Sequence, residues 1–311
     1  MTRVSFLVTI FILCAFDIWA AEAHGNRADF AEYGPNGKYI AIAGDDLLLL
    51  DRRGREVRLV NESAPEARVV SFSQNGEWLA AESDDYKIHI YRVKEARPFP
   101  VFFQGITKRR YEQSRLVFSP NGDMLATSNS DKIVIYSLRP GQEGNVLLTI
   151  PRASSNVHRS TAAFVATPDW KFFFHNMQLI ELTTDAKGKL GFKRGRQLSW
   201  GRVDTSLYAI APDASRVVVA GRGGLDQAVF DLKTGNQIMG NSNLKTYALA
   251  ASKDFSKIYM NQAIWNIKTK KMQTLYQIGT KNKNTRRQIS VATDGEFMIG
   301  LYQYSAEGRL L

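Results

Sequence analysis

Apolar residues along this chain occur in short runs, and polar turns separate the runs at regular intervals. One example begins with the apolar run Arg115–Phe118, continues through the polar turn Ser119–Gly122 and resumes with Leu125 and Ala126. Beyond the N-terminal segment, no stretch shows the 3.6-residue period of an amphipathic helix. Short apolar runs bounded by turn signals predict an all-β fold.

A turn signal recurs seven times. The strongest copies are Gly34–Gly37, Ser73–Gly76 and Ser119–Gly122, in which Asn precedes Gly and tolerates the positive φ of a tight hairpin. The weaker copies are Thr167–Trp170, Ala211–Ala214, Ser252–Phe255 and Ala292–Gly295. The Asn or Asp of each copy stands at 36, 75, 121, 169, 213, 254 and 294, which gives a mean spacing of 43 residues. A period of this length predicts a repeat architecture.

Each repeat contains up to four predicted strands. The first two flank the turn, as in Arg68–Phe72 and Trp78–Ala81. The third strand follows a second polar turn, as in Lys87–Tyr91, Lys132–Tyr136 and Gln227–Asp231. The fourth strand is less apolar, as in Glu56–Val60 and Val146–Ile150. The last repeat leaves room for at most one short strand after its second, so we expect it to be incomplete.

Two segments resemble the WD-repeat family. They are Phe118–Ala126 followed by Asp131–Tyr136, and Val229–Gly235. The resemblance covers residues 28 to about 305 and implies a β-propeller of about seven four-stranded blades, the last one incomplete. No Gly-His pair precedes a unit, and Tyr91-Arg92 and Tyr136-Ser137 stand where the family has Trp-Asp. The chain therefore resembles a divergent, bacterial-style member.

The N-terminus has the pattern of a secretion signal. Arg3 precedes an apolar run from Val4 to Trp19, and small residues follow at Ala20, Ala21 and Ala23. This pattern predicts a signal peptide over residues 1–23, cleaved near 21–23, and a propeller over residues 24–311. The protein would then be periplasmic or secreted. A retained N-terminal anchor is the alternative, and no later stretch is apolar enough to span a bilayer.

Composition narrows the chemistry. The only cysteine, Cys14, lies in the apolar N-terminal run, so a processed chain has no disulfide, zinc-thiolate site or cysteine nucleophile. The four histidines, at 24, 89, 158 and 175, lack metal-ligand spacing. The pairs Asp45-Asp46 and Asp84-Asp85 fall where the repeat needs a turn, which favours a structural role over calcium binding or acid–base catalysis. We therefore predict no catalytic residue, metal or cofactor.

Charge gives the clearest functional signal. The chain carries a formal net charge of +11, which favours acidic partners. Most of the basic clusters fall between the last strand of one repeat and the first strand of the next, and such connectors share one face of a propeller. The predicted basic face comprises Lys108, Arg109, Arg110, Arg152, Arg159, Lys193, Arg194, Arg196, Arg202, Lys281, Lys283, Arg286 and Arg287.

These observations favour an exported, non-catalytic interaction scaffold that binds an acidic protein surface or an anionic envelope polymer through this face. One alternative is a propeller-type hydrolase or lactonase with a metal or carboxylate site at the central channel. A second alternative is extracellular binding of polyanions, including nucleic acid, which is less favoured. Membrane contact would be peripheral or through a retained anchor. A solvated, Lys-rich set of connectors without a partner would explain the same charge pattern.

Overall fold

The computed structural model describes residues 28–35, 37–44, 47–51, 56–59, 67–83, 85, 87–94, 97–104, 115–129, 131–152, 164–198, 205–221, 227–241, 249–260, 263–275, 289–291, 297–299 and 302–304. None of these residues is helical, as predicted. The predicted signal peptide and Cys14 lie outside the described residues. Within the described part of the chain there is no helix long and apolar enough to cross a membrane.

The described strands form seven antiparallel sheets, numbered here as blades 1 to 7 in chain order. Blade 1 contains β1 (Ala28–Tyr33), β2 (Tyr39–Gly44), β3 (Leu47–Asp51) and β4 (Glu56–Leu59). Blade 2 contains β5 (Ala67–Phe72), β6 (Trp78–Ser83), β7 (Lys87–Arg92) and β8 (Arg97–Gln104). Blade 3 contains β9 (Leu116–Phe118), β10 (Met124–Ser128), β11 (Lys132–Ser137) and β12 (Val146–Pro151).

The remaining blades follow the same order. Blade 4 contains β13 (Phe164–Ala166), β14 (Phe172–His175), β15 (Gln178–Thr184) and β16 (Leu190–Gln197). Blade 5 contains β17 (Thr205–Ile210), β18 (Arg216–Gly221), β19 (Gln227–Asp231) and β20 (Gln237–Asn241). Blade 6 contains β21 (Leu249–Ala251), β22 (Lys257–Met260), β23 (Ala263–Asn266) and β24 (Lys271–Thr274). Blade 7 contains β25 (Ile289–Val291), β26 (Phe297–Ile299) and β27 (Tyr302–Tyr304).

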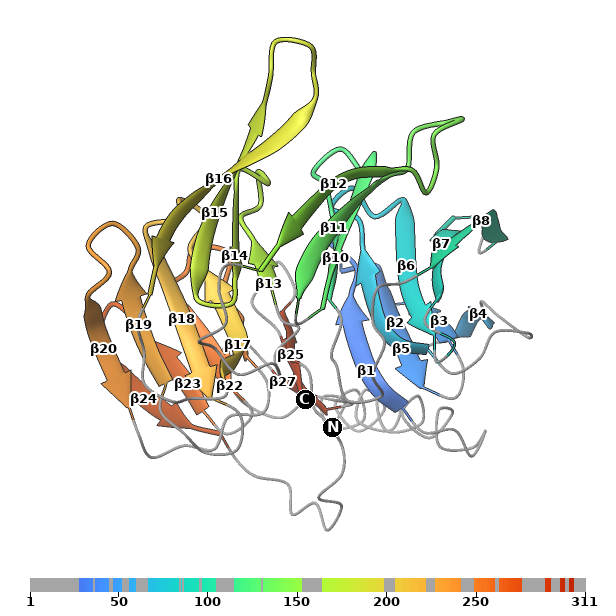
Figure 1. Cartoon of the computed structure of the whole chain (residues 1–311). Helices are drawn as coiled ribbons and strands as arrows, with labels where there is room; N and C mark the ends of the chain where they lie inside the picture. Colours follow the sequence, from blue (N-terminus) through green and yellow to red (C-terminus); the bar gives the residue numbers. More distant parts are fainter. Residues whose placement is uncertain are drawn as a thin grey trace, which may run out of the picture.

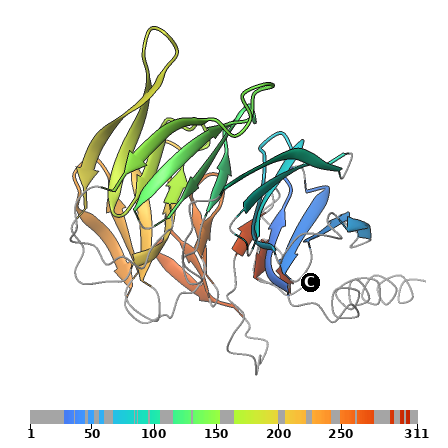
Figure 2. The same ribbon diagram turned by 45° about the vertical axis from the view of Figure 1, so that its right-hand side comes forward.

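The blades are arranged around a ring with the first strand of each sheet innermost (Figure 1). Strand β25 lies beside both β21 and β1, so the last sheet closes the ring against the first blade. Figure 2 shows this closure, with the red strands next to the blue ones. An all-β propeller of four-stranded blades is therefore confirmed. Six blades are complete, and not about seven, because the seventh sheet has three described strands.

The core lies between neighbouring blades because side chains alternate across each strand. In β11, Val134 and Tyr136 pack in one cluster with Ile88 and Ile90 of blade 2. The alternate residues Ile133 and Ile135 join a second cluster with Phe164 and Phe173 of blade 4. Blade 3 is thus buried on both faces, which explains why its middle strands are nearly continuous apolar runs.

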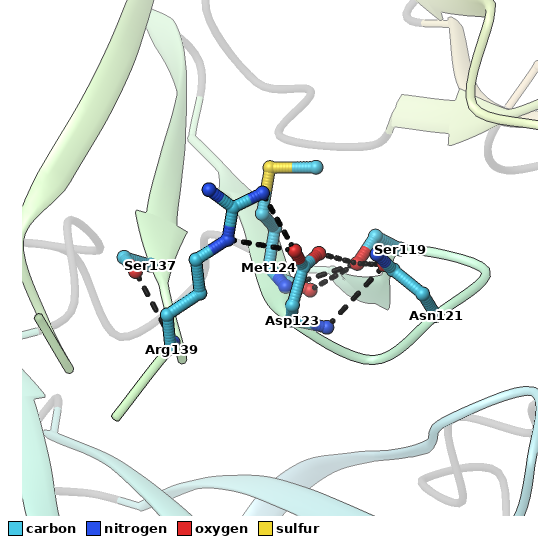
Figure 3. Close-up of polar contacts among 6 residues, drawn as sticks. All are labelled: Ser119, Asn121, Asp123, Met124, Ser137 and Arg139. Atoms are coloured by element: carbon cyan, nitrogen blue, oxygen red, sulfur yellow. Dashed lines mark hydrogen bonds and ion pairs between the residues drawn. The ribbon is translucent and has the colours of Figure 1, made fainter. Parts of the chain in front are cut away.

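Hydrogen bonds within the turn fix the hairpin between the first two strands of a blade. In blade 3, Ser119 Oγ donates to Asn121 Oδ1 at 2.9 Å and accepts from the backbone N–H of Met124 at 2.9 Å. Asp123 also accepts from Arg139 Nε at 2.8 Å (Figure 3). Asn121 therefore holds the Ser119 hydroxyl, which in turn binds the backbone of Met124. Such local side-chain hydrogen bonds are typical of Asn in turns.

Three of the weaker turn copies keep the same backbone without glycine, and the fourth, Ala292–Gly295, lies outside the described residues. The φ angle is 76° at Gly122, and Trp170, Ala214 and Phe255 adopt 60°, 54° and 56° at the equivalent position. A left-handed conformation costs a residue with a side chain about 1–2 kcal/mol. Hydrogen bonds within the same turn help to hold this backbone. In the turn of Phe255, Asp254 accepts from the side chain of Ser252 and from Ser256, and these bonds lower the pKa of Asp254 to about 2.

Candidate functional site

The structure describes four of the thirteen residues predicted to form the basic face. Arg152 follows β12 at the start of a connector, as predicted. Lys193, Arg194 and Arg196 instead lie in β16, the outermost strand of blade 4, so the connector assignment is wrong for these three. An outermost strand has little of its surface buried, and its sequence need not be apolar. The other nine lie outside the described residues: Lys108, Arg109, Arg110, Arg159, Arg202, Lys281, Lys283, Arg286 and Arg287.

A β-bulge directs the arginines of β16 toward different blades. Ile180 pairs with Arg194 while Gln178 pairs with Gln197, so β16 carries one extra residue between these pairs. An extra residue reverses the side-chain alternation. Arg194 reaches back to blade 3, whereas Arg196 lies against blade 5, where a Cβ added at Gly235 would stand 2.7 Å from Arg196 Cδ.

Arg194 connects blades 3 and 4 through uncharged acceptors. Its Nη2 donates to the carbonyl oxygen of Pro151 at 2.6 Å, and its Nη1 donates to Gln178 Oε1 at 2.6 Å. The guanidinium carbon lies 5.4 Å from the centre of the Phe192 ring. These contacts hold the guanidinium in place and leave its positive charge unneutralised.

Arg152 lies at the same junction. Its backbone N–H donates to the carbonyl oxygen of Asp131 at 2.7 Å. Its side chain is partly exposed, but Nε and Nη2 are buried and make no hydrogen bond with the described residues. Buried polar groups in native proteins nearly always have a partner, so this guanidinium is an exception that needs an explanation.

His175 is buried at the base of the junction and stays neutral at neutral pH. Burial, together with the charges of Arg152 and Arg194, lowers its pKa to about 4, against the opposing effects of the hydrogen bond to Asn129 and the charge of Asp131. Nε2 lies 3.0 Å from the carbonyl oxygen of Asn129, which requires this nitrogen to carry the proton and donate. His175 therefore adds no positive charge to the two arginines, and the exposed Asp131 is an acidic group close enough to act on His175.

A second polar site lies among the innermost strands of blades 1 to 3. Glu32 of β1 is partly buried, and its Oε1 accepts from the backbone N–H of Phe72 in β5 at 3.1 Å. Burial raises the pKa of Glu32 to about 7, although the positive charge of Arg115 opposes this shift. Burial also lowers the pKa of Arg115, which the charge of Glu32 counteracts. Here the charges of a guanidinium and a carboxyl group act on each other.

The acidic turns behave as structural elements where they are described. Asp85 accepts from Ser83 Oγ and from the backbone N–H of Lys87 at 3.2 Å, and pairs with Lys87 Nζ at 2.9 Å. Asp45, Asp46 and Asp84 lie outside the described residues. Within the described residues, no group of three His, Cys, Asp or Glu side chains is placed to hold a metal ion.

Comparison with known proteins identifies the fold. The crystal structure of the Cps50 (Swd1) β-propeller domain from Myceliophteria thermophila superposes with a TM-score of 0.61 at 11% sequence identity, covering 90% of this chain and 93% of that one. The chain has a β-propeller fold. No family model matches the sequence, and no curated protein does either. The likeness at this identity extends to the fold alone.

At the junction of blades 3 and 4, the charges of Arg152 and Arg194 both act on His175, and neither arginine forms an ion pair with another described residue. Two guanidinium groups lie together there, and guanidinium groups bind carboxylates and phosphates through paired hydrogen bonds. Sequence reasoning missed Asn129, Asn176 and Gln178, which hold His175 and Arg194 in position. Their shared signal is that each lies at or next to the turn between the second and third strands of its blade.

Proposed function

We propose that this WD-repeat-like propeller is an exported, non-catalytic interaction scaffold that binds an acidic surface of a partner protein. The contact surface is β16 together with the junction of blades 3 and 4. The observation that carries the proposal is that Arg194 of blade 4 donates to the carbonyl oxygen of Pro151, directly before Arg152 of blade 3, and that both arginine charges act on His175. Export rests on the sequence pattern of residues 1–23 and remains a prediction.

Apolar side chains beside the basic strand favour a protein over a simple polyanion. The hairpin of β15 and β16 projects beyond the rest of the ring (Figures 1 and 2). Leu182, Leu190 and Phe192 of this hairpin are only partly buried, and Val146 in the adjacent strand β12 is 57% exposed. Arginine combined with apolar and aromatic side chains is typical of protein interfaces, whereas polyanion binding depends mainly on charge.

A matched pair of charge reversals tests the proposal. The first variant is Lys189→Glu with Lys193→Glu, in and beside β16. The control is Lys268→Glu with Lys271→Glu in blade 6, which changes the net charge equally at exposed positions. We expect poly-L-glutamate to bind the first variant about tenfold more weakly than the wild type by fluorescence anisotropy, and the control nearly as well as the wild type.

Two results would reject the proposal. Equal losses in both variants would mean that only the overall charge matters. Tighter binding of inorganic polyphosphate than of poly-L-glutamate, with a salt dependence that accounts for all of the affinity, would indicate a generic polyanion-binding surface instead of a protein-docking surface.

A further inference from the structure

The buried edge of Arg152 has the form of a carboxylate-binding group. Nε and Nη2 lie along one edge of the planar guanidinium group, and together they present two parallel N–H donors. Both atoms are buried and neither makes a hydrogen bond with the described residues. An unsatisfied, charged donor is among the costlier defects that a folded protein can contain.

The neighbours of Arg152 leave it without an acceptor. Arg194 uses the carbonyl oxygen of Pro151 and the amide oxygen of Gln178. The carbonyl oxygen of Asn129 lies within hydrogen-bond distance of His175 Nε2, and the Asn176 amide nitrogen lies 3.2 Å from that same ring nitrogen. Asp131 is exposed, and its backbone oxygen accepts from the Arg152 main chain. These described polar groups are therefore engaged elsewhere, and none of them accepts a hydrogen bond from Arg152 Nε or Nη2.

We infer that Arg152 and Arg194 form a subsite for a single side-chain carboxylate, supplied by an acidic segment of the partner protein. This inference rests on the proposed function and names the group that the surface recognises. Arg152 as a residue is partly exposed, but its Nε–Nη2 edge is buried in the free protein, so binding requires a rotation of the guanidinium that presents this edge to the ligand. Arg194, fixed from blade 4, adds a second positive charge at the same point.

A carboxylate fits this subsite better than a phosphate group does. The two donors of the Arg152 edge match the two oxygens of a carboxylate. Asp131 lies close enough to influence the electrostatics of the junction, and its negative charge disfavours a doubly charged phosphate more than a singly charged carboxylate. The pairing would satisfy the two donors that make no hydrogen bond in the free protein.

The test uses the full chain and a hexaglutamate peptide capped at both ends, so that only side-chain carboxylates are available. We compare the wild type with Arg152→Lys, which keeps the charge but removes the paired donors, and with Arg152→Gln. Arg216→Gln, at an exposed position in blade 5, is the matched control. We expect a loss of about tenfold for Arg152→Lys and a larger loss, up to about a hundredfold, for Arg152→Gln, with little change in the control.

Thermal unfolding of the same proteins separates binding from a structural role. Because Arg152 Nε and Nη2 are buried without a hydrogen bond to any described residue, Arg152→Gln should keep or raise the melting temperature of the free protein while weakening peptide binding. Hexaglutamate binding that depends on Lys189 and Lys193 but not on Arg152 would overturn the subsite and leave the proposed function standing. Failure of hexaglutamate and poly-L-glutamate to bind the wild type would overturn both, and equal affinity of Arg152→Lys and the wild type would refute paired recognition.

Discussion

Two polar sites between blades differ in how their arginines are neutralised. Among the innermost strands, Arg115 faces the carboxylate of Glu32, and each group shifts the pKa of the other toward its charged form. At the junction of blades 3 and 4, Arg194 contacts uncharged acceptors and two donors of Arg152 make no hydrogen bond. The first site balances charge within the fold. The second has excess positive charge that a partner can neutralise.

Replacing Glu32 should produce the largest change at the balanced site. Its pKa is raised from 4.5 to about 7, so the folded protein binds this proton more tightly than the unfolded chain does. Stability from this group is present below pH 4.5 and is lost as the pH rises toward 7, by up to about 3 kcal/mol. Glu32→Gln should remove this loss. Urea unfolding of both proteins across this pH range measures it, and parallel curves would contradict the burial of Glu32.

Replacing His175, at the junction of blades 3 and 4, should change the pH dependence of the free energy of unfolding by a similar amount. Here stability is lost as the pH falls, whereas at Glu32 it is lost as the pH rises. Its pKa falls from 6.5 to about 4 on folding, so the unfolded chain takes up the proton first. Stability is full above pH 6.5 and decreases by up to about 3 kcal/mol as the pH falls toward 4. His175→Gln keeps a donor for the Asn129 carbonyl and should flatten this decrease. An unchanged acid profile in urea unfolding would show that His175 is accessible to solvent.

Replacing Arg194 should destabilise the free protein to a smaller degree. Arg194→Gln removes two hydrogen bonds from a charged donor, and we expect a loss of about 1–2 kcal/mol in the free energy of unfolding. Lys193→Gln, on the exposed part of the same strand, is the control and should change stability by less than about 0.5 kcal/mol. Equal effects of the two substitutions in chemical denaturation would mean that the contacts to blade 3 contribute nothing.

The smallest predicted effect concerns a turn remote from both sites. Ala214 has a φ of 54° at a position where other repeats carry glycine. Ala214→Gly removes this strain, and we expect a gain of up to about 1 kcal/mol, reduced by the greater freedom of glycine in the unfolded chain. The melting temperature reports the change. A decrease would show that packing of the Ala214 methyl group outweighs the strain.

The sequence was sufficient to predict the elements that depend on local chemistry. The turn copies at Asn75, Asn121 and Asp169 all form hairpins between the first and second strands, and the predicted third strands match β7, β11 and β19. These predictions succeed because turn backbone conformation and two-residue alternation are properties of short segments.

The site could be predicted only in part, because it depends on contacts between distant segments. The sequence predicts Arg152 as part of a basic face. The approach of Arg194 to neighbouring Pro151, however, spans two blades and depends on the bulge in β16. Lys193, Arg194 and Arg196 read as connector residues because a strand that is exposed along most of its length lacks an apolar pattern. Nothing in the local sequence indicates which acceptors an arginine will find on another blade.

The most direct test of the contrast between the two sites is the free energy of unfolding of Arg115→Gln and Arg152→Gln, measured well above the pKa of Glu32. We predict that Arg115→Gln destabilises the protein by about 3 kcal/mol, because it leaves the charged Glu32 carboxylate uncompensated. We predict that Arg152→Gln leaves the free protein equally stable or more stable. The reverse order, with Arg152→Gln the more damaging substitution, would contradict the account.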